Sequence, residues 1–212
     1  MDTDLVQAVA RHVETVMGSE GFRQVSAVVA NCKMFALELE ALQDEDASSI
    51  DTEALIVAAY FHDISTPTYG LQNHEVQSAE MAADFLLSHD VLEERVQKVE
   101  QAILAHMTPI TTPSQRAAAP IEGQILYDAD KVGHLSGLAV VTSLIEFGGR
   151  YSNRTVTGDV LANILRHIEE RFIELYQSLN TEPARELARE KFNQSVAFLD
   201  GVIEHVSDAT PV

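Results

Sequence analysis

Apolar residues recur at helical spacing along nearly the whole chain, and no long alternating pattern typical of a strand competes with them. This periodicity predicts an all-α fold, a bundle of about eight helices. The expected helices cover residues 2–17, 21–42, 51–64, 74–88, 91–106, 119–148, 156–180 and 182–206.

The expected helix boundaries coincide with short polar residues and with proline and glycine. Asp51, Asn73 and Thr181 each stand at an expected helix start, where a short polar side chain can accept an unpaired backbone N–H group. Prolines and glycines gather in residues 65–70, 108–120 and 147–158, which we expect to be breaks. Segment 108–120 is long for a loop in a compact domain, so a functional lid and a disordered loop both stay open.

The length of 212 residues suits one domain over residues 1–212, with a motif-bearing core at about 10–150 and C-terminal helices at about 156–206. The last helix can pack on the core or join two chains in a homodimer. Cys32 is the only cysteine, which excludes a disulfide framework. No basic leader and no apolar run of roughly 20 residues occurs, so we expect a cytoplasmic protein without a membrane partner.

The chain is strongly acidic, with 33 acidic against 14 basic residues and a formal net charge of −19. Binding to DNA or RNA depends on Lys and Arg neutralising phosphates, so a nucleic-acid polymer is a poor candidate partner. A small phosphate ester would need a bound cation and a few basic groups to reverse the local field.

Residues of the types that bind metal ions stand at the ends of several expected helices. The pair His62-Asp63 closes the apolar run 55–61, His74 begins a helix, and His106 ends one. Imidazole nitrogens and carboxylate oxygens are the ligands that zinc and first-row divalent cations take from proteins. A lone histidine at a helix end is more often a capping or surface residue, but the joint occurrence favours a metal centre. We expect ordinary surface residues at His12, His89, His167 and His205.

Asp130 lies on an otherwise core-facing helix, where a carboxylate is costly unless it is paired or bound to a metal. His134 follows Asp130 by four residues and therefore shares its helix face, so we expect it beside the same cavity. Asp128 points to another side, and we expect it to be solvated or hydrogen-bonded to a ligand imidazole.

Four segments together carry a family resemblance. They are His62-Asp63 after a hydrophobic helix, Asn73-His74-Glu75 leading into Ser78-Ala79-Glu80, Ala105-His106, and Asp128-Ala129-Asp130-Lys131. With these segments, roughly residues 10–150 resemble the HD-domain superfamily of metal-dependent phosphohydrolases. The resemblance implies an HD-like helical bundle, with His62, Asp63 and Asp130 as primary ligands and His74 and His106 as ligands of a second metal or of phosphate. One or two divalent ions per chain are implied, of Mn, Mg, Ni, Fe or Zn.

The chain departs from the family pattern at one position, because Gln24 stands where the first histidine is expected. An amide oxygen is a weaker, neutral ligand than an imidazole. Three outcomes therefore stay open: the first site binds metal less tightly, it holds a harder cation, or a site built from His62, Asp63, His74 and His106 replaces it. The alternative to an active enzyme is therefore a weakened or inactive HD-fold protein that binds a metal or a nucleotide.

The expected activity is hydrolysis of a small phosphate ester, with a nucleotide as the substrate class. A divalent cation held by His62, Asp63 and Asp130 would lower the pKa of a water from about 15.7 towards about 7 for attack on phosphorus. Asp63 would orient the nucleophile, and Lys131 would stabilise charge on the phosphoryl oxygens. His134 and Arg150 are expected to bind the substrate, although a solvated surface charge is the open alternative for Lys131 and Arg150. The fold leaves the particular nucleotide undecided.

Overall fold

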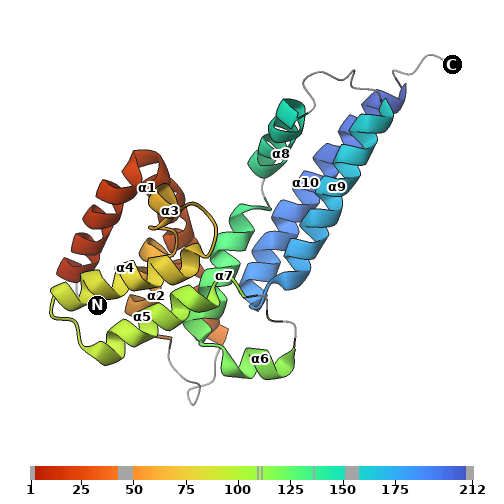
Figure 1. The fold of residues 1–212 in the computed structure, drawn as a ribbon. Helices are drawn as coiled ribbons and strands as arrows, with labels where there is room; N and C mark the ends of the chain where they lie inside the picture. The colour runs from red at the N-terminus through yellow and green to blue at the C-terminus, as the bar shows by residue number, and fades with distance from the viewer. Residues whose placement is uncertain are drawn as a thin grey trace. The chain divides into compact units, whose positions relative to one another are not determined.

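The structure is a computed structural model that describes residues 3–42, 50–108, 110, 112–135, 137–150 and 158–208. Over these residues the chain forms ten helices and no strand (Figure 1). The prediction of an all-α fold is confirmed. None of the described helices combines the length and the hydrophobicity that crossing a bilayer requires.

The chain divides into two compact units. Unit 1 comprises residues 1–130 with 180–184, and unit 2 comprises residues 131–179 with 185–212. The expectation of one domain over residues 1–212 stays a prediction.

Unit 1 is built around a buried helix. Its helices are α1 (Thr3–Leu42), α2 (Thr52–Phe61), α3 (Thr66–Tyr69), α4 (His74–Ser88), α5 (Glu93–Ala105), α6 (Pro113–Ala118) and most of α7 (Ile121–Gly133). Every residue of α2 from Glu53 to Ala59 is buried, as is Phe61. A helix that is apolar on all sides must be covered on all sides, and α2 packs against α1, α4 and α5. The turn that follows α2 therefore emerges among the ends of its neighbours.

Several predicted boundaries agree with the structure. Gly18 has a left-handed backbone (φ 71°) inside α1, which places a kink in the predicted break between residues 17 and 21. Asp51 caps α2 by accepting a hydrogen bond of 3.0 Å from the backbone N–H of Ala54. Asn73 does precede α4, but its backbone is left-handed (φ 54°) and its side chain makes no capping bond. The start of α4 was therefore predicted correctly for the wrong reason.

Two boundary predictions were wrong. The single helix expected at 119–148 is two helices, α7 and α8 (Gly137–Arg150). Backbone bonds from His134 to Lys131 and from Leu135 to Val132 tighten the end of α7 into a turn. The loop expected at 108–120 contains the short helix α6, which begins with a capping box between Thr112 and Gln115; residues 109 and 111 lie outside the described residues.

A glycine sets the approach of α7 to α5. A Cβ atom built on Gly123 would lie 2.6 Å from the Cβ of Ala105, which is closer than real Cβ atoms come. Glycine therefore permits α7 to pack tightly against the last turn of α5, directly before His106.

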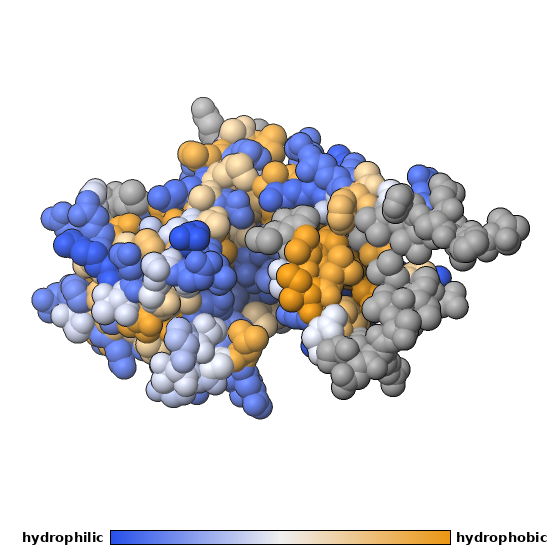
Figure 2. Space-filling model, turned by 90° about the horizontal axis from the view of Figure 1, so that it is seen from above, coloured by the Kyte–Doolittle hydropathy of each residue, from blue (hydrophilic) through white to orange (hydrophobic). Residues whose placement is uncertain are grey.

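Unit 2 contains α8, α9 (Gly158–Ser178) and most of α10 (Glu182–Asp208), and α8 contacts α9. The buried side of α9 carries Leu165, Ile168 and Phe172. Val141 and Ile145 on α8 are exposed. On the face drawn in Figure 2, hydrophobic residues gather in an orange patch. Homodimer formation through the last helix stays a prediction.

Candidate metal centre

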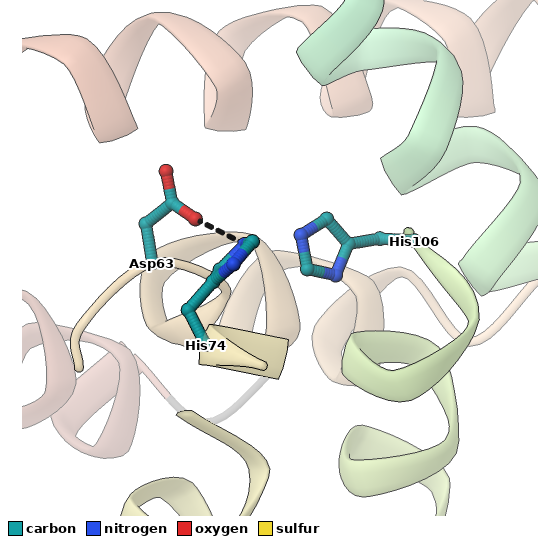
Figure 3. Close-up of side chains that lie close together, drawn as sticks. All are labelled: Asp63, His74 and His106. Carbon is teal, nitrogen blue, oxygen red and sulfur yellow. Dashed lines mark ion pairs between the residues drawn. The ribbon is translucent and has the colours of Figure 1, made fainter. Parts of the chain in front are cut away.

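Three side chains from three separate segments of unit 1 converge on one point (Figure 3). Asp63 lies in the turn after α2, His74 is the first residue of α4, and His106 directly follows α5. One ligand atom of each lies within 4.8 Å of the others. His74 and His106 are buried, whereas the side chain of Asp63 is 33% exposed, so the cluster is open on the carboxylate side.

The carboxylate of Asp63 lies between two imidazoles. Its Oδ1 is 3.1 Å from Nε2 of His74, and its Oδ2 is 3.5 Å from Nε2 of His62. The ring of His106 lies edge-on to both imidazoles, with centroid distances of 5.3 Å to His62 and 5.5 Å to His74. His62 thus adjoins the same cluster, and each Asp63 oxygen faces a different histidine.

All three histidines are held by the same hydrogen bond. Nδ1 of His62 donates to the carbonyl of Ala59 (2.8 Å), Nδ1 of His74 to that of Leu71 (3.0 Å), and Nδ1 of His106 to that of Ile103. A carbonyl oxygen only accepts, so in each neutral imidazole the proton is on Nδ1 and Nε2 carries the lone pair. This is the arrangement that outer partners impose on histidines that bind metals through Nε2.

The donor set fits a divalent cation. With the proton on Nδ1, the lone pair of His74 Nε2 faces the anionic Oδ1 of Asp63 at 3.1 Å, and nothing attractive acts between two acceptors. A proton or a cation between them removes the repulsion. Imidazole nitrogens with a carboxylate oxygen suit zinc and first-row transition ions.

The electrostatic environment keeps the central imidazole neutral. Burial, and then the neighbouring His62, lower the pKa of His106 to about 4. The hydrogen bond to Ile103 and the charges of Asp130 and Asp63 oppose this lowering. At neutral pH the Nε2 lone pair of His106 is therefore available to a cation without loss of a proton.

The structure brings together four of the predicted site residues: His62, Asp63, His74 and His106. Gln24 is exposed on α1, and Asp130 is half-buried on α7. Three further predicted residues belong to unit 2: the half-buried Lys131 and the exposed His134 and Arg150. The roles of all these residues as ligands or substrate contacts stay predictions.

The other histidines differ from one another. His12 is half-buried, 4.5 Å from the ring of Phe85, so the expectation of an ordinary surface residue was wrong there. His89 and His167 are exposed as expected. The side chain of His205 lies outside the described residues.

Asp128 is a structural residue, which corrects the expectation of a solvated side chain or an imidazole partner. It is fully buried, and its Oδ1 accepts from the backbone N (2.7 Å) and Nδ2 (3.1 Å) of Asn180. Its Oδ2 accepts from the backbone N and Oγ1 of Thr181, both at 2.7 Å. Burial raises the pKa of Asp128 to about 6 against the pull of these four bonds. Asp128 thereby ties α7 to the start of α10, a pairing across 52 residues that no local sequence signal indicates.

A pocket of about 300 Å³ opens beside the residues that flank His106. Its walls are mostly apolar, with amide and hydroxyl groups among them, and include Ala105, Thr108, Gly123, Gln124, Tyr127 and Asn180. No sequence pattern indicates this pocket, because its walls come from α5, α6, α7 and the α9–α10 turn.

The sequence pattern of the HD domain matches residues 24–133, more than half of the chain, so the chain belongs to the HD domain family. This family falls within a superfamily of metal-dependent phosphohydrolases, and its members bind divalent metal ions. No curated protein sequence matches the chain.

Solved structures with the same fold cover nearly the whole chain. The Lin1889 protein of Listeria innocua is 18% identical with a TM-score of 0.63, over 93% of this chain and 94% of its own. YpgQ of Bacillus subtilis in complex with ADP is 16% identical with a TM-score of 0.67, over 94% of each chain. The selenomethionine form of YpgQ is 17% identical with a TM-score of 0.67, over 97% of each chain. At these identities the likeness establishes the fold.

Proposed function

We propose that the protein is a metal-dependent phosphohydrolase that acts on a small phosphate ester, a nucleotide being the substrate class. The observation that carries this proposal is the cluster of Asp63, His74 and His106, whose ligand atoms lie within 4.8 Å of one another. The inward-facing Nε2 lone pairs have a cation as their natural partner.

The proposed metal ligands form two groups, both of which include Asp63. Asp63, His74 and His106 would hold one cation, and Asp63, His62 and Asp130 would hold a second where two bind. Gln24 would be the weak ligand at the position of the missing histidine. The bound cation would supply an activated water and neutralise phosphoryl charge.

The chain's own residues would orient the reactants around that centre. Asp63, the most open member of the cluster, would orient the nucleophilic water towards phosphorus. Lys131 would stabilise charge on the phosphoryl oxygens, and His134 and Arg150 would bind the substrate.

Two observations favour a nucleotide. YpgQ, which shares the fold, holds ADP in its solved structure. In this chain a pocket of about 300 Å³, lined in part by Ala105 and Thr108 on either side of His106, would take the nucleoside while the phosphates reach the metal centre. The net charge of −19 disfavours a nucleic-acid polymer in the same site.

The test is a metal-restoration assay on the full chain. Protein stripped with a chelator would be assayed with nucleoside mono-, di- and triphosphates and with an aryl phosphate, before and after re-addition of Mn²⁺, Mg²⁺, Ni²⁺, Fe²⁺ or Zn²⁺. We expect activity to disappear on chelation and to return with at least one ion. Phosphate release that is indifferent to the chelator would refute the proposal.

A second candidate function is a weakened or inactive protein that binds a metal or a nucleotide without turnover. The observation that favours it is Gln24, an amide in place of the first family histidine. Gln24→His distinguishes the two. If the site is only weakened, this variant raises metal affinity and activity; if the pocket serves binding alone, the variant tightens the metal and leaves turnover absent.

A further inference from the structure

Two fully buried serines lie between the segments that carry the metal cluster. Ser65 follows Asp63 by two residues in the turn after α2, and Ser78 lies one turn into α4 from His74. Both serines are 0% exposed. Neither serine is among the cluster's candidate ligands, so their burial needs another explanation.

The two serines form a directed chain of hydrogen bonds. The backbone N–H of Ser65 donates to Oγ of Ser78 (3.3 Å), and Oγ of Ser78 donates to Oγ of Ser65 (3.0 Å). Oγ of Ser65 in turn donates to the carbonyl of His74 (3.0 Å). Each hydroxyl thus both donates and accepts, and the chain ends on the backbone of a cluster histidine.

These hydrogen bonds form a short path between two residues that the polypeptide connects through a longer, exposed stretch. The covalent path from Asp63 to His74 runs through the exposed stretch 67–73, with left-handed backbone at Gly70 and Asn73. The serine bonds instead join the Asp63 turn to the first turn of α4 through buried groups, where a hydrogen bond is not exchanged for one to water.

We propose that Ser65 and Ser78 are positioning residues that set the distance between Asp63 and His74 for cation binding. Oδ1 of Asp63 and Nε2 of His74 lie 3.1 Å apart, and a divalent ion requires both atoms at a fixed separation. Ser65 connects the two ligands directly, because its backbone belongs to the turn that carries Asp63 and its hydroxyl donates to the carbonyl of His74. The proposal rests on the proposed function only in taking the cluster to bind a cation.

The experiment measures Mn²⁺ and Co²⁺ affinity of the full chain by calorimetry, without any substrate. The variants are Ser65→Ala and Ser78→Ala. The matched control is Ser88→Ala, because Ser88 also lies on α4 and donates to a backbone carbonyl, but is exposed. We expect affinity to fall about tenfold to 100-fold in Ser65→Ala, as on loss of an outer partner of a metal site, and less in Ser78→Ala. Ser88→Ala should bind as the unaltered chain does.

Circular dichroism and metal-free melting show which variants are folded, and the Co²⁺ absorption spectrum reports the ligand geometry. A weaker affinity with an altered Co²⁺ spectrum in a folded variant supports a positioning role that loss of stability alone would not produce. If Ser65→Ala does not fold, Ser78→Ala carries the test, since it removes both bonds between the two serines. Unchanged affinity in the folded variants, or an equal loss in Ser88→Ala, overturns the proposal. If the unaltered chain binds metal in the same titration, such a result counts against the positioning role of the serines and not against the proposed function.

Discussion

Two groups of histidines in unit 1 show what distinguishes a candidate metal centre from ordinary packing. The first group, His62, His74 and His106, is buried around the carboxylate of Asp63. The second group, His12 and His89, lies against the ring of Phe85, with centroid distances of 4.5 and 4.1 Å.

Anchoring of the ring is common to both groups. Nδ1 of His89 lies 2.9 Å from the carbonyl of Phe85, much as Nδ1 of His62 lies 2.8 Å from that of Ala59. A fixed tautomer is therefore not the signature of a metal centre. Of the two groups, the first alone has a carboxylate oxygen held beside several buried Nε2 atoms.

The largest expected effect is a loss of divalent-metal affinity when a histidine of the first group, but not of the second, is replaced. His106→Ala removes a ligand from the buried cluster, so we expect divalent-metal affinity to fall by more than about 100-fold, beyond the loss of an outer partner. His89→Ala is the matched control, because it removes an anchored but exposed imidazole, and we expect unchanged affinity. Calorimetric titration measures both. Equal metal affinities in the two variants would show that the buried cluster is not the metal site.

The carboxylate is the element that the second group lacks, so its replacement is the next test. In Asp63→Asn, the amide nitrogen would donate to Nε2 of His74 or His62 and close it to a cation. We expect metal affinity to fall about 100-fold, while the metal-free protein becomes more stable by about 1 kcal/mol through the new hydrogen bond. Metal titration and urea unfolding measure the two effects, with the exposed Asp84→Asn as control.

A loss of stability in metal-free Asp63→Asn would contradict the assignment of inward-facing lone pairs. It would mean that a protonated imidazole already pairs with Asp63 in the absence of metal. The cluster would then be a buried ion pair.

The fold and the cluster residues were predicted from local signals, and the contacts that hold the cluster were not. Helical periodicity predicted the helices, and His62-Asp63 with His74 and His106 stood out because each lies at a helix end. The break after α7 was missed because no proline marks it, and isolated glycines such as Gly133 and Gly137 are tolerated inside helices. A signal for α6 was present, since Thr112 and Gln115 have the spacing of a capping box.

The pairings between distant segments carried no such signal. Ser65 and Ser78 read as ordinary polar residues of a turn and a helix, and only the packing of α4 beside the α2 turn makes them partners. Likewise, the role of Asp128 follows only from its hydrogen bonds to Asn180 and Thr181, which the sequence does not indicate.

Asp128 offers a test of whether burial alone makes a carboxylate a metal ligand. It is more buried than Asp63, but it is surrounded by four donors rather than by imidazoles. In Asp128→Asn the amide nitrogen would face donors, so we expect a loss of about 2–3 kcal/mol in the free energy of unfolding. Metal affinity of the folded variant should change by less than about tenfold, below the range for an outer ligand partner. Urea unfolding and metal titration measure the two, and a variant of full stability that binds no metal would make Asp128 part of the centre.

The smallest expected effect concerns the second group and its dependence on pH. Burial, and then the neighbouring His89, lower the pKa of His12 in the folded protein below the ordinary value of 6.5. Between that folded pKa and pH 6.5 the unfolded chain binds more protons at this residue, so the contribution of His12 to stability is present above pH 6.5 and is lost as the pH falls. His12→Phe keeps a ring against Phe85 without the titration, and its melting temperature should fall less than that of the unaltered chain between pH 7.5 and 5.5. Imidazole NMR titration gives the direct check. The pKa of His12 should lie below 6.5 in the unaltered chain and should rise in His89→Gln. A value at or above 6.5 in the unaltered chain would show that Phe85 and His89 leave His12 as free to charge as a surface histidine.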